Sequence, residues 1–600
     1  MYDNSAAQEA CAMNGSTARA LPTPLEWIHG QYGSAADSLP KPANWVPIME
    51  SPMYTPRKMR VITIGAGFSG LMVAHKIQHD YKMETYCDHV IYEKNPEAGG
   101  TWFENQYPGV ACDVPAHIYT FTWAPNPKWS SYYVKGPEIR SYIQNVAKEY
   151  DLEKNVVFNA KVLSATWTED EGKWVVEVDM GDHIKRDNAD VVINASGVLN
   201  DWHWPDIPGL EKFKGHLCHS AAWDQNYDYT GKTVAVIGNG SSAIQIVPSL
   251  QPIVKHMTTF IRSATWISPN FAAEHTRDGG NFQYSEEELK EFEDPDKLLA
   301  YRKKIEHGFN KLYRGLQYGT PEHEFFQAQS RQIMVSRMEG NKDMQEKLIP
   351  TWAFGCRRLS PGDGYLEALQ KPNVNAIFNS ATAITADGVV DSDGAEHKVD
   401  AIICATGFDT SWAKKWPVKG RNGALLKEQW SEDPQSYLSV CAKNFPNLFF
   451  ILGPNAPVGN GSLIPSMEWA GMYAVNWIRK IAREQIHSIE PKQGSVDDFN
   501  VYTQEYLKRT VYTSPCRSWY KNNKVDGPVT AMWAGSPMHF KDMMSTQRGE
   551  DFDIKYCSPN RFRFMGNGTT QRDKKDMDLS YYLRKDGWKQ DLKDTEELLV

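Results

Sequence analysis

The sequence predicts an α/β protein with two parallel-sheet units, the second nested in the first. The prediction depends on two glycine-rich loops, each of which follows a short apolar run typical of a buried strand. The first loop, Gly65-Ala66-Gly67-Phe68-Ser69-Gly70, follows residues 60–64; the second, Gly238-Asn239-Gly240-Ser241-Ser242-Ala243, follows residues 233–237. Strand, glycine loop and helix in this order are typical of a Rossmann-like domain, in which backbone N–H groups at a helix N-terminus hold a pyrophosphate.

The next apolar run of each unit ends in a residue of opposite charge. Residues 89–92 lead to Glu93, and residues 257–261 lead to Arg262. A carboxylate at this position accepts the hydroxyls of an unphosphorylated ribose, whereas a guanidinium binds a 2′-phosphate. One dinucleotide with a free ribose and one NADPH are together typical of a flavoprotein that takes hydride from NADPH.

The chain, with 600 residues, is too long for one hydrophobic core and predicts several domains. Two further buried runs, Val191–Asn194 and Ala401–Cys404, lead into Gly197 and Gly407, and we expect each to close one dinucleotide fold. The first fold is expected to resume near residue 400. The predicted division is an N-terminal extension (1–58), an FAD-binding domain (59–204 and 396–490), an NADPH-binding domain (205–395) with a polar helical insertion (284–348), and a C-terminal segment (491–600).

Composition excludes several classes of protein. A net charge of −9 gives no basic surface for nucleic acid. The chain contains no run of 18 apolar residues, so we expect no membrane span. The N-terminus lacks the pattern of a signal peptide. Nine cysteines without a C-x-x-C pair predict reduced thiols in a cytoplasmic protein and disfavour a disulfide reductase. We expect Cys112 and Cys356 to be small packing residues.

Two longer motifs surround the glycine loops. Residues 99–113 match the pattern (A/G)-G-x-W-x-x-x-x-(F/Y)-P-(G/M)-x-x-x-D, and residues 213–224 match F-x-G-x-x-x-H-x-x-x-W-(P/D). With these motifs the chain resembles the class B flavoprotein monooxygenases of the Baeyer–Villiger family over about residues 58–540. The sequence of residues 112–121 is most similar to that of fungal members of this family.

The resemblance implies a site for FAD, a site for NADPH and a catalytic pair. The catalytic residues would be Arg358 and Asp113, with Arg358 as the active-site arginine and Asp113 holding it. The FAD-binding residues would be Gly65, Gly67, Phe68, Ser69, Gly70, Glu93, Gly100, Thr101, Trp102, Asp113, Val114, Tyr119 and Val162. The NADPH-binding residues would be Ala111, Cys112, Gly238, Asn239, Gly240, Ser241, Ser242, Ala243, Ile261, Arg262, Arg357 and Trp519. Arg357 stands where the family usually has Lys, and Trp519 matches a tryptophan of a mobile loop, here residues 514–528.

The implied reaction consumes NADPH and O₂. In the family, NADPH reduces the flavin, O₂ adds at its C4a atom, and the deprotonated peroxide attacks a ketone to give an ester or lactone. A fixed guanidinium stabilises the negative charge on oxygen. The long insertion and the aromatic C-terminal segment are compatible with a polycyclic ketone of terpenoid, polyketide or steroid-like type in fungal secondary metabolism. Two alternatives stay open: a monooxygenase that hydroxylates nitrogen or sulfur, and a flavin-binding regulatory protein without oxygenation.

Overall fold

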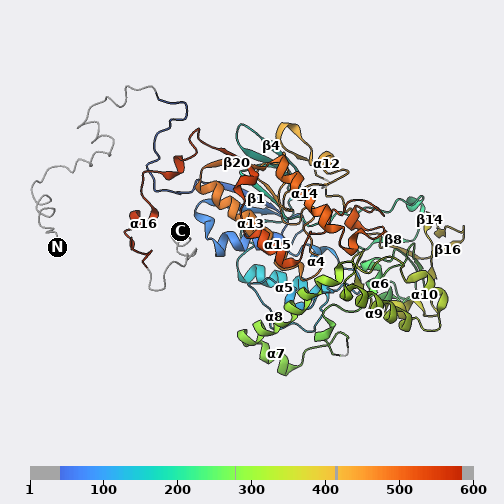
Figure 1. The fold of residues 1–600 in the computed structure, drawn as a ribbon. Coiled ribbons are helices and arrows are strands. Elements are labelled where there is room, and N and C mark those ends of the chain that lie inside the picture. Colours follow the sequence, from blue (N-terminus) through green and yellow to red (C-terminus); the bar gives the residue numbers. More distant parts are fainter. Residues whose placement is uncertain (1–40, 278, 413–415, 584–600) are drawn as a thin grey trace, which may run out of the picture.

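The computed structural model describes residues 41–277, 279–412 and 416–583, and two parallel five-stranded sheets organise them (Figure 1). The first sheet has the order β19-β7-β1-β2-β3. Its glycine loop lies between β1 and helix α3, as expected for a Rossmann-like unit. The elements are β1 (Met59–Ile64), α3 (Phe68–His75), β2 (Cys87–Tyr92), β3 (Val156–Val157), β7 (Val191–Asn194) and β19 (Leu448–Phe450).

The second sheet has the order β13-β10-β9-β17-β8. Strand β17 pairs with β9 and β8, in register from Ala401 against Val234 and His216. The predicted boundary at residue 396 is therefore wrong, because β17 belongs to the second unit and the chain returns to the first only after it. The elements are β8 (His216–His219), β9 (Thr233–Ile237), α6 (Ser241–Leu250), β10 (His256–Phe260), β13 (Val374–Ile377) and β17 (Ala401–Cys404).

Smaller sheets cover the ends of these two units. Strands β4 and β5 form an antiparallel pair, to which β18 and β6 add on either side. A three-stranded antiparallel sheet, β14-β15-β16, extends the second unit, and β20 pairs with β21 near the C-terminus. The strands are β4 (Lys161–Thr168), β5 (Lys173–Asp179), β6 (Ile184–Ala189), β14 (Ala381–Ile384), β15 (Gly388–Asp391), β16 (Glu396–Lys398), β18 (Val418–Lys419), β20 (Ile486–Pro491) and β21 (Phe552–Tyr556).

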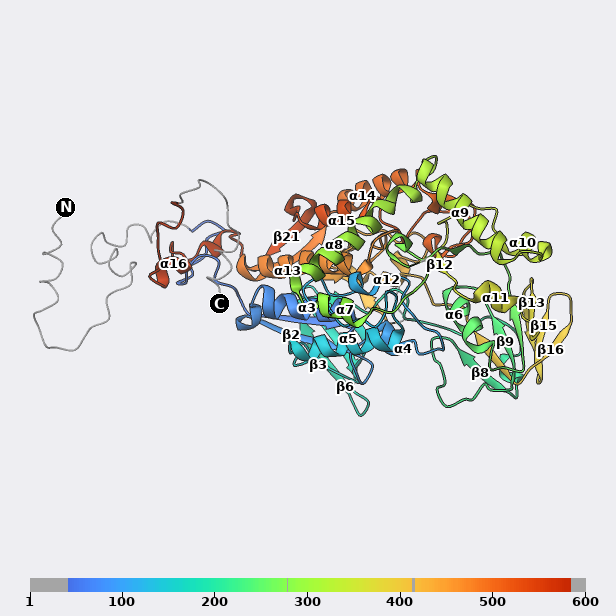
Figure 2. The same ribbon diagram turned by 90° about the horizontal axis from the view of Figure 1, so that it is seen from below.

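The segment 284–348 is helical and joins the two units. Helix α8 packs against the turn Ala116–Ile118 of the first unit, and α9 packs against α11 of the second. Figure 2 shows α8 and α9 running along one side of the molecule, from the first unit toward the second. The helices of the segment are α7 (Glu286–Phe292), α8 (Pro295–Lys311), α9 (Pro321–Arg337) and α10 (Lys342–Leu348), followed further on by α11 (Tyr365–Leu369).

Helix α13 (Leu463–Arg483) covers the first sheet and is the longest helix described. It packs against α3, and its inward face, which includes Tyr473 and Trp477, is fully buried. None of the described helices is long and apolar enough to cross a membrane. The remaining longer helices are α5 (Gly136–Glu149), α14 (Gln493–Leu507) and α15 (Pro537–Met544).

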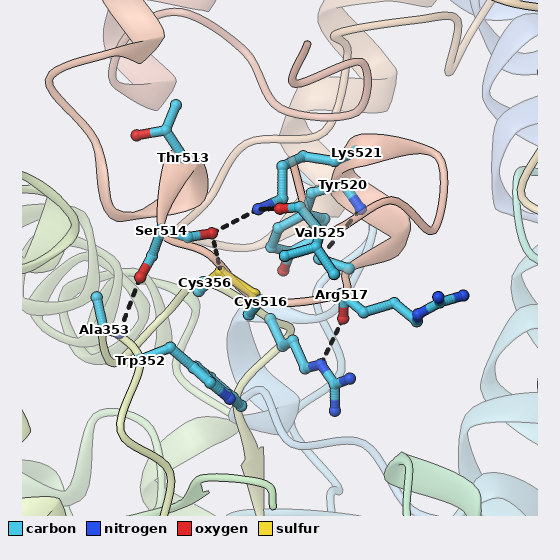
Figure 3. Close-up of a disulfide and its surroundings, with 12 residues drawn as sticks. Trp352, Ala353, Cys356, Thr513, Ser514, Cys516, Arg517, Tyr520, Lys521 and Val525 are labelled. Atoms are coloured by element: carbon cyan, nitrogen blue, oxygen red, sulfur yellow. Dashed lines mark hydrogen bonds between the residues drawn. A yellow bond between two sulfur atoms is a disulfide. The ribbon is translucent and has the colours of Figure 1, made fainter. Parts of the chain in front are cut away.

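Cys356 and Cys516 form a disulfide, with Cα atoms 6.4 Å apart (Figure 3). The predictions that the cysteines are all reduced and that Cys356 is only a packing residue are therefore wrong. The pair is separated by 160 residues, so the lack of a C-x-x-C motif carried no information about it. The other cysteines within the described residues are free, and Cys11 lies outside them.

Candidate functional site

A cavity of about 2230 Å³ lies between the two parallel sheets and reaches both glycine loops. It is larger than the ~300–1,000 Å³ pocket of one drug-sized ligand. Residues from the first unit, the second unit, the helical segment and the C-terminal segment all line it. The cavity therefore has room for more than one ligand at the place where the two units meet.

The first glycine loop forms a hollow, called here the first cradle, which is open only because glycines line it. Gly65 has φ +102°, and a Cβ atom there would lie 2.9 Å from the carbonyl oxygen of Ala195. Across the loop, Gly67 faces Gly100, where a Cβ atom would lie 2.9 Å from the Cα of Gly67. Helix α3 begins directly after the loop with uncharged residues, so its free N–H groups and positive end are directed at the cradle. This arrangement fits the pyrophosphate of a dinucleotide.

Glu93 is 4% exposed and connects the end of β2 to this cradle. Its Oε2 accepts a hydrogen bond from the N–H of Ala66 at 2.6 Å, and its Oε1 accepts one from the N–H of Asn95 at 2.8 Å. Burial raises the pKa of Glu93, and the two backbone donors oppose that shift. The carboxylate therefore fixes the glycine loop, and it also lines the cavity, where an acceptor could meet ribose hydroxyls.

The second glycine loop is similar in form. Gly238 has φ +118° and lies against the carbonyl oxygen of Ala405, whereas a Cβ atom at Gly240 would point into open space. Helix α6 begins at Ser241, again with uncharged residues in its first turn. Arg262, two residues after β10, is exposed at the edge of the same cavity. A phosphate group would meet both the helix N-terminus and a cation here.

The segment 99–113 reaches from the first unit to helix α6. Gly109 has φ +84°, and a Cβ atom there would lie 2.2 Å from Ser249 Oγ, so α6 approaches too closely for any side chain. Gln245 of α6 accepts a hydrogen bond from the Tyr107 hydroxyl at 2.9 Å and donates one to the carbonyl oxygen of Ala111 at 3.0 Å. These contacts explain the Tyr-Pro-Gly part of the first motif and carry Asp113 to the middle of the cavity.

Asp113 and Arg358, 245 residues apart, form an ion pair inside the cavity. Arg358 Nη2 donates to both carboxylate oxygens, at 2.7 and 2.6 Å. The Arg358 side chain is 43% exposed because it faces the cavity. The cavity itself lies deep in the protein at this point, so the guanidinium is far from the outer surface. Burial by itself lowers the pKa of Arg358, but the charge of Asp113, with smaller effects of Tyr520, Cys112 and Tyr119, raises it overall. The guanidinium is therefore a permanent cation in the wall of the cavity.

Arg357 points to a different part of the cavity wall. Its Nε donates to the carbonyl oxygen of Arg517 at 2.6 Å, and its Nη1 donates to Ser263 Oγ at 3.3 Å. Burial lowers the pKa of Arg357, and the neighbouring cations Arg262 and Arg517 lower it further. Three arginines from three distant segments therefore lie close enough for their charges to interact, which is the pattern of an anion site.

Aromatic side chains complete the region beside the first cradle. Tyr119 packs edge-on against both Phe68 and Trp102, with ring centroids 5.6 and 5.8 Å apart. Burial raises the pKa of the Cys112 thiol well above its usual range, so this cysteine packs as a neutral group. Trp519 lies half-buried at the cavity wall, in a 3₁₀ turn (Trp519–Lys521).

Most of the residues expected to bind cofactors line the cavity. Gly70, however, lies against the loop itself, where a Cβ atom would be 1.9 Å from the carbonyl oxygen of Gly65, and Ala243 is fully buried. Ile261 is 1% exposed and uses its N–H for a strand bond to Ile377. Four of the residues expected to bind a cofactor lie outside the cavity lining, so the structure does not support direct contact between them and a cofactor: Gly70, Ser242, Ala243 and Ile261.

The sequence motifs missed the opposite wall of the cavity. This wall is built from the helical segment and the C-terminal part and is mostly apolar. Its residues have no shared local pattern, because they come from α8, α9, the start of α13 and several loops that meet only in the folded chain. They include Phe271, Phe309, Leu312, Leu316, Phe325, Phe326, Phe354, Val458, Leu463, Met467, Tyr512 and Met532, together with the cation Arg517.

Comparison with known proteins agrees with this geometry. A model of the flavin-binding monooxygenase-like family matches residues 58–275. An Aspergillus terreus protein named FAD-binding monooxygenase tazF is 45% identical over 539 residues, which cover 89% of this chain and 96% of that protein. The chain belongs to the flavin-binding monooxygenases.

Two further relatives extend the comparison within this family. A Baeyer-Villiger monooxygenase of Pseudomonas aeruginosa is 33% identical over 490 residues, 81% of this chain and 89% of that protein. The crystal structure of cyclohexanone monooxygenase from Rhodococcus sp. Phi1 bound to NADP⁺ superimposes with a TM-score of 0.73 at 28% identity, over 84% of this chain and 100% of that chain. The predicted family, the two-domain Rossmann-type fold, the flavin-dependent monooxygenase class and the pairing of FAD with NADP are confirmed.

Proposed function

We propose that this protein is a Baeyer–Villiger monooxygenase that uses FAD, NADPH and O₂ to convert a ketone into an ester or lactone. The observation that carries the proposal is the Asp113–Arg358 pair, which places a permanent cation inside the cavity between the two glycine loops. When bound, the flavin supplies an oxygen atom from O₂ after it has accepted hydride from NADPH. Insertion of that oxygen beside a carbonyl develops negative charge on oxygen, and a fixed guanidinium stabilises such charge.

Each residue of the site has a part in this scheme. The loop at Gly65 and Glu93 would hold FAD, and the loop at Gly238 with Arg262 would hold NADPH. Arg358 would stabilise the oxygen charge, and Asp113 would keep Arg358 oriented through its two hydrogen bonds. The pair favours ketone oxygenation over hydroxylation of nitrogen or sulfur, because the hydroxylation uses a protonated oxidant that needs no cation.

The apolar wall supports a bulky ketone as substrate. The phenylalanines at 309, 325 and 326 face the cavity from the helical segment. Apolar and aromatic walls of this kind bind hydrophobic ring systems, whose burial contributes about 25 cal/mol per Å². A polycyclic ketone of terpenoid, polyketide or steroid-like type therefore suits the site better than a small aliphatic one.

The variant Arg358→Ala tests the proposal. We expect it to retain FAD and NADP⁺ while ester formation falls by about 10²- to 10³-fold, the usual effect of removing one donor to a developing oxyanion. Products from a panel of small and polycyclic ketones, an amine and a thioether would be analysed by mass spectrometry. The control is Arg186→Ala on strand β6, which removes an exposed ion pair with Glu177 of β5.

Three results would contradict the proposal in different ways. Normal ester formation by Arg358→Ala would remove the arginine from the mechanism. Oxidation of the amine or thioether without oxidation of any ketone would indicate a hydroxylating monooxygenase. Bound FAD without NADPH-dependent O₂ consumption would indicate a regulatory protein.

A further inference from the structure

The Cys356–Cys516 disulfide joins two loops of the cavity wall that are distant in sequence. One loop leads from α10 to β12 (Ser360–Pro361) and carries Arg357 and Arg358; the other contains residues 514–521 and carries Arg517 and Trp519. The bond therefore ties the loop that the family resemblance describes as mobile directly to the active-site arginines.

Hydrogen bonds surround this covalent bond on both loops (Figure 3). The N–H of Ala353 donates to Ser514 Oγ at 3.1 Å, and Arg357 Nε donates to the carbonyl oxygen of Arg517 at 2.6 Å. Lys521 Nζ donates to the carbonyl oxygens of Ser514 and Val525, which braces the second loop from within. Cys356 Sγ also lies 3.1 Å from the carbonyl oxygen of Ser514. The disulfide is thus the centre of a contact that fixes the position of Arg517.

This position has an electrostatic cost. Arg517 adds its charge to Arg357 and Arg262, and no carboxylate among the described residues pairs with any of the three. Like charges held together repel one another, so the trio is favourable only when an anion occupies the space between them. A covalent tether holds Arg517 in place even when that anion is absent.

We propose that the Cys356–Cys516 disulfide is a redox latch on the nucleotide site, which holds Arg517 as a third cation for the 2′-phosphate. The inference rests on the proposed function only in its assignment of NADPH to the second glycine loop. With the bond closed, Arg517 stays beside Arg357. With the bond open, repulsion between the cations moves Arg517 and its loop outward, and the site loses affinity for the phosphorylated dinucleotide.

The redox step balances with ordinary thiol chemistry. A dithiol reductant opens the bond: one thiolate attacks a sulfur of the disulfide, its second thiolate displaces the mixed disulfide, and two electrons and two protons pass to Cys356 and Cys516. Hydrogen peroxide closes it, as two thiols and one peroxide give the disulfide and two waters. Both cysteines are nearly inaccessible, with Cys356 at 0% and Cys516 at 3% exposure. Attack therefore requires the loop 514–521 to lift.

Thermodynamic linkage gives the latch a second, independent consequence. If the closed bond strengthens NADP⁺ binding, bound NADP⁺ must make reduction of the bond less favourable by the same factor. It must also slow reduction, because the nucleotide holds the loop down. NAD⁺ lacks the 2′-phosphate, so it should protect the bond much less.

The first experiment measures binding rather than oxygenation. Dissociation constants for NADP⁺ and NAD⁺ would be measured on the FAD-loaded protein in the oxidised form, after reduction with dithiothreitol, and in the variant Cys516→Ser. We expect the affinity for NADP⁺ to fall on the order of fivefold in the reduced protein and the variant, which is the contribution of one exposed ion contact, with little change for NAD⁺. The control Cys557→Ser removes an exposed free thiol and should behave as the unmodified protein.

The second experiment uses Arg517→Ala and the rate of reduction. In this variant NADP⁺ affinity should already be low and should no longer depend on the redox state. Thiol counting by mass spectrometry would follow reduction of the unmodified protein with NADP⁺, with NAD⁺ and without nucleotide. Equal NADP⁺ affinity in both redox states, equal reduction rates with and without NADP⁺, or a purified protein with both thiols free under oxidising conditions would each overturn the latch. A protein that shows the linkage but oxidises no ketone would refute the proposed reaction and leave the latch in place.

Discussion

Glu306, in helix α8 beside the cavity wall, makes the local stability of this helix depend on pH. Burial raises the pKa of Glu306 from 4.5 to about 7, opposed in part by Asn310, whose Nδ2 donates to Oε1 at 3.3 Å, and by the charge of Arg302. A carboxyl with a raised native pKa binds more protons in the folded state than in the open state. The contribution of Glu306 to the stability of the helix is therefore complete below pH 4.5 and is lost as the pH rises through about 7.

The size of this loss follows from the two pKa values. With a pKa of 4.5 in the open helix and about 7 in the folded helix, the equilibrium constant for local folding falls on the order of 50-fold between about pH 5 and about pH 8. The substitution Glu306→Gln keeps the shape and the hydrogen-bonding oxygen but does not ionise. We expect α8 in this variant to keep its stability across the same range.

Hydrogen exchange measured by mass spectrometry can follow α8 alone, because local opening is reported peptide by peptide. After correction for intrinsic exchange rates, peptides from residues 295–311 should lose protection with rising pH in the unmodified protein and not in Glu306→Gln. The control Glu346→Gln changes an exposed carboxylate on α10. Equal pH dependence in the unmodified protein and Glu306→Gln, or lower protection of the variant at about pH 8, would refute the assignment.

Two further substitutions test the cradle and the junction between the units. Glu93→Gln leaves a single acceptor for the N–H groups of Ala66 and Asn95, so we expect FAD to bind on the order of tenfold more weakly, as measured by flavin absorbance after gel filtration; unchanged flavin retention would contradict the role of the carboxylate. Gly109→Ala places a Cβ atom 2.2 Å from Ser249 Oγ at a positive φ and should lower stability by ~2 kcal/mol or more in thermal unfolding. The control Gly494→Ala, where a Cβ atom meets open space, should change stability little, and equal effects of the two substitutions would show that α6 yields to the new atom.

Local patterns predicted the parts of the fold that local physics controls. Each dinucleotide cradle is defined within about 15 residues by a buried apolar run, a glycine loop and the start of a helix. The charged residues Glu93 and Arg262 are found directly after the next strand of each unit. The β4–β5 hairpin follows the same rule, because buried and more exposed residues alternate along both strands and a short polar turn joins them. Each of these features depends on neighbours in sequence, so the sequence contains the whole signal.

The two predictions that were wrong, and one pairing that local spacing could not reveal, concern residues whose partners are distant in sequence. Strand β17 was given to the wrong unit because any buried apolar strand fits either parallel sheet, and only its pairing with β9 decides. The disulfide was missed because its cysteines are separated by 160 residues. The pairing of Asp113 with Arg358 came from the family resemblance and not from spacing, since 245 residues separate the two.

The sequence by itself determined that this chain holds two dinucleotide cradles and what charge each presents to its ribose, because the backbone N–H groups, glycines and strand-end residues of a cradle lie within one short stretch. The tertiary structure alone decided which side chains share the cavity between them: the apolar wall, the cluster of Arg262, Arg357 and Arg517, and the disulfide that holds the last of these. Their distances depend on how two sheets, a helical segment and a C-terminal loop pack together, and packing is a property of surfaces that meet only after the chain has folded.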